Sequence, residues 1–342
     1  MLKSEAGRFW AVLISAVAML ACTAGAQAVS IDWTTVGDAS NRWELAGTGA
    51  GGFGANRLCG AVSYTYKISK YEITNGQYRD FLNAVAQTDT NGLWSSDMAS
   101  TRGGIARTGT PGSYSYSAKD GDPNWDSRPV NFVSFWNACR FVNWIANDQP
   151  VGAQGPSTTE GGAYTLTLAG MNNNTIQRNQ YAKVAIASED EWYKAAYSKG
   201  GSTNADYCDY ALSSDTTPDN NAPGSDSGNS TNYKKNGAFA VGSPYFSTVA
   251  GAYSGHSAYG TYDQNGNVAE WNDSIPVNMT RGVRGGSWGS DEDPMAAAYR
   301  NFSSPSFGYA DIGFRIVEIP EPVTLCLLGM GGLAMLARRR GK

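Results

Sequence analysis

The sequence predicts a mixed α+β domain in which loops dominate and the helices and strands are few and short. Glycine is abundant, with 41 residues, and aromatic residues make up 12% of the chain while charged residues make up only 16%. This composition is typical of a loop-rich fold whose irregular backbone is pinned by large aromatic side chains. Three segments carry helix-start signals, and several short apolar runs have the character of strands.

Three helices are expected. Thr74 and Gln77 form a capping box, so a helix should begin there. Ser134 is positioned to cap a second helix, and Ser188 with Glu191 forms a second capping box. Apolar residues recur at helical spacing in the first two helices. They are Tyr78, Phe81, Leu82 and Val85 in the first helix, and Ala138, Phe141, Val142 and Ile145 in the second. The third helix is expected to run from Trp192 to Tyr197.

Strands are expected around these helices and towards the C-terminal end. Residues 64–73 alternate in polarity, and residues 129–133 are strand-like. Residues 281–288 and 312–317 are apolar enough to be buried strands. Residues 198–237 consist mainly of Ser, Asn, Asp and Gly, which predicts a long surface loop.

The N-terminal end is predicted to be an export signal. Lys3 and Arg8 precede an apolar stretch over residues 9–21, and small residues at alternating positions within residues 24–28 suit cleavage by signal peptidase. Residues 1–28 are therefore expected to be a signal peptide.

The C-terminal end has the order of parts of a sorting signal. Pro320, Glu321 and Pro322 precede an uncharged run of 15 residues, and a basic cluster follows at residues 338–342. The run is shorter than the about 20 residues that span a bilayer comfortably, and the basic cluster is expected to stay on the cytoplasmic side. This order resembles the PEP-CTERM signal of exopolysaccharide-producing Gram-negative bacteria. The alternative is a plain membrane anchor.

The PEP-CTERM resemblance implies a route for the protein. Residues 320–342 would anchor the precursor transiently in the inner membrane through a short transmembrane segment, and an exosortase-type membrane protease would be the partner that cuts it. The product would be secreted, or held at the cell surface or in the extracellular matrix. Between the two sorting segments, residues 29–319 are expected to form one domain.

Charge narrows the classes of partner. Removal of both segments takes away six basic residues and Glu5, so 20 basic and 29 acidic residues remain when Glu321 is kept, a net charge of roughly −9. A surface of this sign argues against nucleic acid or an anionic membrane, and is compatible with divalent cations or neutral glycans.

Cysteine and histidine usage excludes several kinds of metal site. The three cysteines outside the sorting segments are Cys59, Cys139 and Cys208, whose spacing fits neither a zinc knuckle nor a CxxC redox pair. One pair can close in an oxidising compartment, and which pair does so stays open. His256 is the only histidine, so a site that needs two imidazoles in one chain is excluded.

Six blocks occur in an order that points to a known family. They are YEITNGQY (residues 71–78), RPVNFVSFWNA (128–138), SEDEW (188–192), GNVAEW (266–271), RGGSW (284–288) and GFR (313–315). Together they resemble the successive blocks of the formylglycine-generating enzyme, or sulfatase-modifying factor, family over residues 30–318. The resemblance implies a compact, loop-dominated variant of the C-type lectin fold.

The same resemblance bears on catalysis. Formylglycine-generating members oxidise a substrate cysteine with two copper-binding cysteines that follow the RGGSW block, and a soft ion such as Cu(I) needs thiolates there. The matching positions in this chain are Ser290 and Met295. The resemblance therefore implies no copper site, no catalytic residues of that kind and no formylglycine generation.

A calcium site is also implied by the resemblance. The matching positions are Asp263, Gly266, Val268 and Glu270, with side-chain oxygens from the first and last and backbone carbonyls from the middle two. Ca²⁺ takes six to eight oxygen ligands, and a glycine allows the tight turn that brings several together. The alternative is that Asp263 caps a turn and Glu270 pairs with an arginine, such as Arg284 or Arg315.

Two classes of function stay open. The first is a non-catalytic, exported, lectin-like domain associated with exopolysaccharide, which binds a glycan or a protein through loops such as residues 91–126 and 198–237. The second is an enzyme of the same family with an unrecognised activity on an exported protein or a polysaccharide. Three exposed acidic residues at 291–293, on one loop, do not suffice for a paired-carboxylate hydrolase site.

Overall fold

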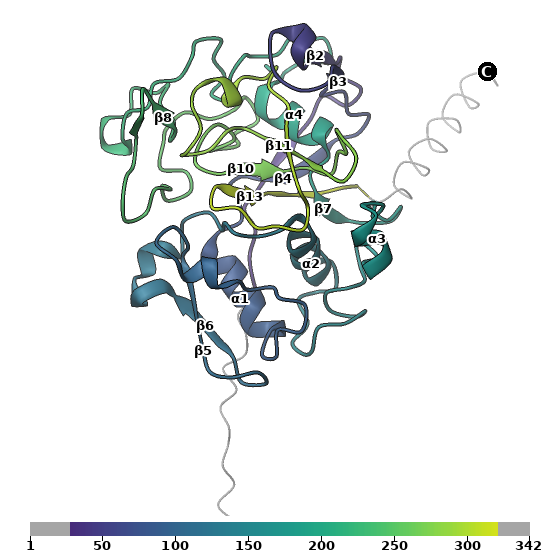
Figure 1. The fold of residues 1–342 in the computed structure, drawn as a ribbon. Helices are drawn as coiled ribbons and strands as arrows, with labels where there is room; N and C mark the ends of the chain where they lie inside the picture. Colours follow the sequence, from purple (N-terminus) through teal and green to yellow (C-terminus); the bar gives the residue numbers. More distant parts are fainter. Residues whose placement is uncertain (1–27, 321–342) are drawn as a thin grey trace, which may run out of the picture.

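Two four-stranded sheets lie at the centre of the molecule, and helices and loops surround them (Figure 1). One sheet has the strand order β1-β4-β14-β7 and the other has the order β12-β11-β10-β13. Three two-stranded hairpins, β2-β3, β5-β6 and β8-β9, lie around them. The computed structural model describes residues 28–320, so the predicted signal peptide, up to residue 27, and the sorting signal from Glu321 onward lie outside the described residues.

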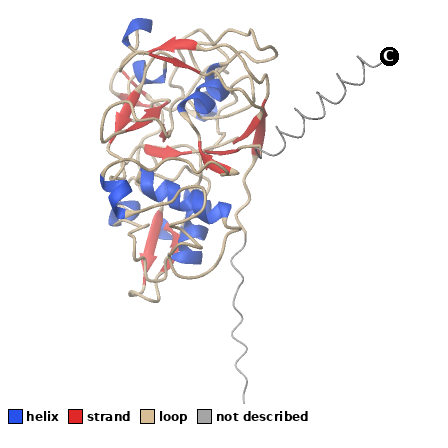
Figure 2. Cartoon of the chain, turned by 90° about the vertical axis from the view of Figure 1, so that its right-hand side faces the viewer, coloured by secondary structure: helices blue, strands red, loops and turns tan. Residues whose placement is uncertain are grey.

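The helices and strands are short. The α-helices are α1 (Asn75–Val85), α2 (Phe135–Ala146), α3 (Leu168–Asn172) and α4 (Glu189–Tyr197). The strands are β1 (Trp33–Val36), β2 (Glu44–Ala46), β3 (Arg57–Cys59), β4 (Tyr66–Ser69), β5 (Ile105–Thr108), β6 (Ser115–Ala118), β7 (Val184–Ile186), β8 (Lys234–Lys235), β9 (Ala238–Phe239), β10 (Ala269–Trp271), β11 (Arg281–Arg284), β12 (Asn301–Ser303), β13 (Ile312–Phe314) and β14 (Ile316–Glu318). Figure 2 shows how much of the remaining chain is loop, which confirms the predicted fold class.

All three predicted helices are present, and their caps are the predicted residues. Thr74 accepts a hydrogen bond from the Gln77 N–H at the start of α1, and the Gln77 side chain accepts one from the Thr74 N–H. Ser188 and Glu191 form the same reciprocal pair at the start of α4. Ser134 caps α2. α3 was not among the predicted helices.

Three of the four strand predictions are right in position and too long in extent. Residues 281–288 form β11 only as far as Arg284, because Gly285 and Gly286 adopt φ values of 94° and 68° that end the extended conformation. Residues 312–317 divide into β13 and β14, which belong to different sheets.

Residues 129–133 are not a strand, which corrects the sequence prediction. Pro129 forms only an isolated bridge with Thr74. Phe132 has a φ of 57°, which breaks the extended run, and its N–H donates to the Tyr309 carbonyl. The segment instead leads directly into the cap of α2.

Aromatic side chains join the helices to the sheets. The Phe141 ring of α2 lies 5.4 Å from Phe81 of α1, 6.0 Å from Tyr78, and 5.5 Å from Phe314 of β13, measured between ring centroids. Most of α2 is buried on all sides, so the one-sided apolar face expected from the sequence understates its burial. Edge-to-face and offset packing of this kind replaces the long ladders that the short strands do not provide.

The long loop predicted over residues 198–237 is present. Residues 198–237 are mostly irregular, although they include β8, and Tyr233 within them is fully buried.

The Cys59, Cys139 and Cys208 thiols are all buried and free, so no disulfide forms among the described residues. Cys59 lies in β3 rather than in a loop. None of the helices described over residues 28–320 is long and apolar enough to cross a bilayer.

Candidate functional site

The turn that follows β11 forms one half of the candidate site. A Cβ atom on Gly285 would lie 2.4 Å from the Gln264 carbonyl oxygen, and one on Gly286 would lie 3.0 Å from the Met295 side chain. Both residues also have positive φ, so this turn requires glycine. The turn places Ser287 and Ser290 next to each other at the end of the sheet.

The hydroxyl groups in this turn form a short chain. The Ser287 and Ser290 Oγ atoms are 3.0 Å apart, and Ser287 Oγ donates to Asp311 Oδ2 at 2.9 Å. Ser290 and Asp311 line a cleft of about 150 Å³ with Ala269, Val283, Arg284, Gly286, Pro294, Asn301, Ser303, Tyr309 and Ile312. No histidine, lysine or cysteine is among these lining residues, so the cleft offers no thiolate, and its one carboxylate, Asp311, already accepts a hydrogen bond from Ser287 Oγ.

Met295 packs inside the domain rather than facing this cleft. Its side chain is fully buried, and its carbonyl oxygen accepts hydrogen bonds from Tyr197 Oη at 3.0 Å and Asn265 Nδ2 at 2.7 Å. Ser290 is half-buried and offers a hydroxyl. A thioether and a hydroxyl do not form a two-thiolate site for Cu(I).

The turn before β10 forms the other half of the site and contains buried carboxylates. Glu72, Asp263 and Glu270 are 1%, 9% and 0% exposed, and the fully buried Arg315 forms an ion pair with Glu270. With all three carboxylates ionised, this carboxylate cluster has a formal charge of −2. Buried charge of this size is expensive unless it is neutralised by protons or by another cation.

Burial changes the protonation of two members of the carboxylate cluster. Burial, followed by the charges of Asp263 and Glu270, raises the pKa of Glu72 well above its usual range. Burial also raises the pKa of Asp263 to about 6. The Glu72 carboxylate accepts hydrogen bonds from Asn267 Nδ2 at 3.2 Å and from the Val268 N–H at 3.4 Å, which tie the cluster to the turn.

The negative charge of the predicted calcium ligands Asp263 and Glu270 suits a hard cation. Both carboxylate oxygens of Glu270, however, already accept hydrogen bonds from other side chains. Glu270 accepts from Arg315 Nη2 at 2.7 Å on one oxygen, and from Arg315 Nε at 2.6 Å and Trp192 Nε1 at 2.7 Å on the other. Arg315 is therefore the partner that the alternative interpretation of Glu270 expected. Asp263 accepts a hydrogen bond from the Gly251 N–H. Across residues 28–320, no group of three or more His, Cys, Asp or Glu side chains is arranged to hold a metal ion.

The backbone of this turn is sharply folded. Asp263, Gly266 and Asn267 have φ values of 60°, 76° and 55°, and a Cβ atom on Gly266 would lie 2.5 Å from the Asn232 carbonyl oxygen. The turn brings Asp263 and Glu270 into one cluster, as the sequence predicted. Glu72 was not among the predicted site residues, although it lies within the YEITNGQY block, where a carboxylate between apolar residues is a signal of a buried polar role.

A second buried ion-pair cluster supports the turn after β11. Glu189, at the start of α4, accepts hydrogen bonds from Arg284 Nη2 at 2.8 Å and from Arg300 Nε at 2.7 Å, and Arg57 Nη1 lies 3.6 Å away. Burial alone raises the pKa of Glu189, but Arg284 and then the other arginines lower it to about 2. Arg284, Arg300 and Arg315 thus each hold a buried carboxylate in the loop-rich core.

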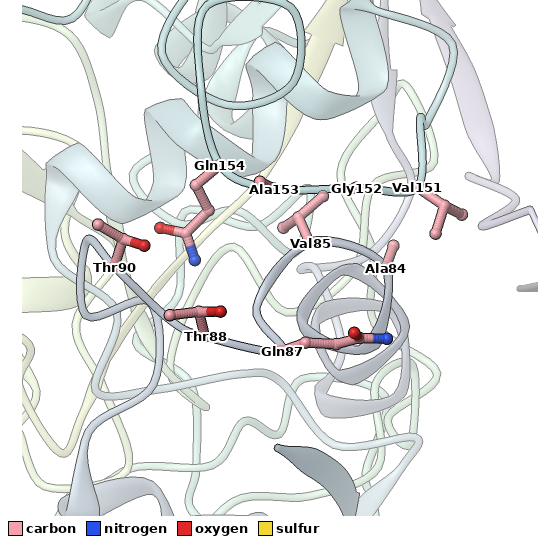
Figure 3. Close-up of a pocket in the computed structure, with 9 residues that line it drawn as sticks. All are labelled: Ala84, Val85, Gln87, Thr88, Thr90, Val151, Gly152, Ala153 and Gln154. Carbon is pink, nitrogen blue, oxygen red and sulfur yellow. The ribbon is translucent and has the colours of Figure 1, made fainter. Parts of the chain in front are cut away.

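Two of the less informative sequence features lie at the surface, as expected. His256 is exposed, and its Nδ1 lies 2.8 Å from the Ser257 carbonyl oxygen. Residues 291–293 are also exposed. A further depression of about 220 Å³ lies between the C-terminal end of α1 and residues 151–154 (Figure 3). Its polar side chains, which include Gln87 and Gln154, are uncharged.

The fold and the site define a class of protein: a loop-rich α+β domain of the sulfatase-modifying type, with Ser290 and Met295 in the segment that follows the RGGSW block. Residues 60–319 match the model of the family described as "Sulfatase-modifying factor enzyme 1-like domain", and the chain belongs to this family. No curated protein matches the chain.

Solved structures agree on the fold. Treponema denticola variable protein 1 is 20% identical, with a TM-score of 0.53, over 86% of this chain and 97% of that one. The crystal structure of CarF is also 20% identical, with a TM-score of 0.51, over 85% of this chain and 99% of that one. At this level of identity the two neighbours establish the fold alone.

Proposed function

We propose that the protein is an exported, exopolysaccharide-associated, lectin-like domain that binds a glycan or a protein and has no catalytic role. The single observation that carries the proposal is the replacement of the family's two copper-binding cysteines by Ser290 and Met295, with Met295 fully buried. Without two thiolates, the family's oxidation chemistry has no metal centre. The scaffold that remains presents long surface loops from a rigid core, which suits binding.

An enzyme with another activity is the alternative. The Ser287, Ser290 and Asp311 chain is the arrangement in this cleft that comes nearest to a reactive group. The Asp311 carboxylate bonds to Ser287 rather than to Ser290, and the lining residues include no histidine or lysine that could take a proton from Ser290 directly. The binding function is therefore favoured over hydrolysis at this site.

Calcium is the proposed metal. Asp263 and Glu270 would supply side-chain oxygens, and Gly266 and Val268 would supply backbone carbonyl oxygens. The carboxylate cluster has a formal charge of −2 when all three carboxylates are ionised, and burial raises the pKa of Glu72 and of Asp263. A bound divalent ion would take the place of the protons that otherwise neutralise the cluster. The ion would be structural, because it would hold the turn next to the Ser290 cleft.

Binding is tested with protein released by cells that express the full chain. We expect the protein to be retained on immobilised exopolysaccharide from an exosortase-containing bacterium and released by the soluble polysaccharide. The same amount of protein should pass through a column of the same matrix without polysaccharide. If the protein is not retained on any extracellular glycan, and no extracellular protein is captured with it, the proposed binding function is wrong.

The proposed sorting route has a separate test. An exosortase-type protease would remove the C-terminal segment near Pro320, Glu321 and Pro322. Intact-mass measurement of the released protein should find a chain that ends close to these three residues and lacks the basic cluster at residues 338–342. A released protein that still carries the basic cluster would show that the segment is a plain anchor.

A further inference from the structure

A second, open cleft lies beside the β2-β3 hairpin and shares no lining residue with the Ser290 cleft. Figure 1 shows where this hairpin lies. The volume of the cleft is about 470 Å³. Its lining comes from two segments, the start of β2 and the first part of the long loop: Arg42, Trp43, Glu44, Leu45, Lys199, Ala205, Asp206 and Tyr207. None of these residues belongs to the six family blocks.

Trp43 gives this cleft an unusual surface. Its side chain is 56% exposed, and Leu45 and Leu58, which face each other across the β2-β3 pair, are 37% and 47% exposed. A tryptophan at the surface is expensive to leave in water, and exposed apolar groups that gather beside polar ones mark binding sites. The exposed part of the indole is therefore available to a ligand in this cleft.

The two walls of the cleft are fixed to each other before any ligand arrives. The Arg42 N–H donates to the Thr203 carbonyl at 3.0 Å, and Tyr207 Oη donates to the Arg42 carbonyl at 2.6 Å. Glu44 Oε2 accepts from Tyr193 Oη at 2.6 Å, which holds this carboxylate in place. A site that is already ordered loses little conformational entropy when it binds.

The charges that line the cleft cancel. Arg42 and Lys199 contribute two positive charges, and Glu44 and Asp206 contribute two negative ones. The cleft therefore offers donors and acceptors without a net field that selects an anion or a cation. An uncharged ligand with many hydroxyl groups fits this lining, whereas a polyuronate would meet two carboxylates and a protein of net negative charge.

The depression beside α1 provides a comparison. It is also free of net charge, but its lining contains no aromatic side chain: Ala84, Val85, Gln87, Thr88, Thr90, Val151, Gly152, Ala153 and Gln154 (Figure 3). A pyranose ring has one face of C–H groups, which packs against the face of an aromatic ring. Of these two depressions, the Trp43 cleft is the one that combines such a ring with fixed polar groups.

We propose that the Trp43 cleft is a binding site for a neutral saccharide. The C–H face of one sugar ring stacks on the Trp43 indole, and its hydroxyl groups bond to the carboxylates of Glu44 and Asp206 and to the Lys199 ammonium. The inference rests on the proposed binding function and specifies its site and the chemical class of its ligand.

Isothermal titration of the full-length protein with cellohexaose, chitohexaose and hexagalacturonate tests the proposal. We expect at least one of the two neutral oligosaccharides to bind, and hexagalacturonate to bind at least tenfold more weakly. Trp43→Ala should weaken the neutral ligand at least tenfold, while Trp43→Phe, which keeps an aromatic face, should stay within about threefold of wild type. Tyr181→Ala is the matched control, because Tyr181 is 70% exposed and does not line the cleft.

The outcomes separate the site from the function. If the protein is retained on exopolysaccharide, but Trp43→Ala is retained equally well, the cleft assignment is wrong and the proposed function stands. Tighter binding of hexagalacturonate than of both neutral ligands would overturn the ligand class. If wild type binds neither neutral oligosaccharide, the saccharide proposal fails, and retention on exopolysaccharide then decides separately whether the broader function survives. Circular dichroism of each variant checks that the substitutions leave the fold intact.

Discussion

The turn before β10 and the turn after β11 lie side by side, yet they carry different ligand atoms. The Gly266 N–H donates to the Gly285 carbonyl at 2.9 Å, and the Trp288 N–H donates to the Asn267 carbonyl at 2.8 Å. The first turn contains buried carboxylate oxygens, whereas the segment after the second contains the Ser290 hydroxyl and the buried Met295 thioether. The two halves of the candidate site therefore differ in chemistry although their backbones are joined.

The difference shows which parts of this scaffold are needed for folding. Glu270 binds Arg315 in the first half, and Arg284 binds Glu189 beneath the second. Removing one partner of such a buried pair leaves an uncompensated charge, so these residues resist change for structural reasons. Ser290 takes part in no such buried ion pair, so a change at this position is expected to leave the ion pairs that hold the fold intact.

The largest expected effect comes from the ion pairs that hold the second turn. Glu189→Gln removes the charge that faces Arg284 and Arg300, so we expect it to lower the free energy of unfolding by about 3–5 kcal/mol. Glu318→Gln is the control, since Glu318 pairs with Lys67 at the exposed surface, and it should cost less than about 1 kcal/mol. Chemical denaturation measures both, and equal effects would contradict the structural role given to Glu189.

The pH dependence of that effect is the next prediction. The folded-state pKa of Glu189 is about 2, below its ordinary value of 4.5, so its stabilising contribution is fully present above pH 4.5 and is lost as the pH falls towards 2. The shift corresponds to a contribution on the order of 3 kcal/mol. The stability gap between wild type and Glu189→Gln should therefore shrink between pH 4.5 and pH 2.5. A gap that stays constant over this range would show that the carboxylate charge is not what stabilises the turn.

The effect of Ca²⁺ on the melting temperature is expected to depend on the turn before β10 and not on the turn after β11. We expect Ca²⁺ to raise the melting temperature of chelator-treated wild type, because binding to the folded state alone stabilises by about 2.7 kcal/mol at a hundredfold excess over Kd. Asp263→Asn should lose this shift. Asp311→Asn changes a carboxylate in the neighbouring half, so it should keep the shift. No shift in wild type, or an equal shift in Asp263→Asn, would remove the calcium assignment.

A gain of function is the smallest expected effect. Ser290→Cys with Met295→Cys restores two thiols at the family's copper positions, so the double variant should bind one equivalent of Cu(I) in competition with a chromophoric chelator. Wild type and the single variant Ser290→Cys should leave the chelator loaded. Copper binding by wild type at the same level as by the double variant would show that the second half of the site has not lost its soft-metal chemistry.

The parts of the fold that were predicted correctly are those that depend on residues close together in the sequence. The caps at Thr74, Ser134 and Ser188 depend on neighbouring residues alone, and so they predicted the helices correctly. The strand at 129–133 was wrong because the positive φ of Phe132 depends on a hydrogen bond to Tyr309, which is distant in the chain. Residues 312–317 divided between two sheets, a feature that apolar periodicity does not record.

Only part of the carboxylate cluster was predictable from the sequence, because its members come from segments that are distant in the chain. Asp263 and Glu270 lie seven residues apart in one block, so their proximity was expected. Glu72 joins them from a block near the other end of the domain, and the excess of negative charge exists only after folding brings the three together. Trp43 precedes the family's blocks altogether, and its exposure depends on how the β2-β3 hairpin packs.

The central claim is that this domain has kept the family's scaffold without its oxidation chemistry. Incubation of purified wild type with copper, oxygen, a reductant and a peptide that carries a cysteine in a sulfatase-type context tests this directly, with the mass of that cysteine as the readout. An active formylglycine-generating enzyme serves as the positive control. We expect no conversion of the cysteine by the wild-type chain, because Ser290 and Met295 offer no pair of thiolates. Measurable turnover to formylglycine would contradict the account and make the protein an enzyme.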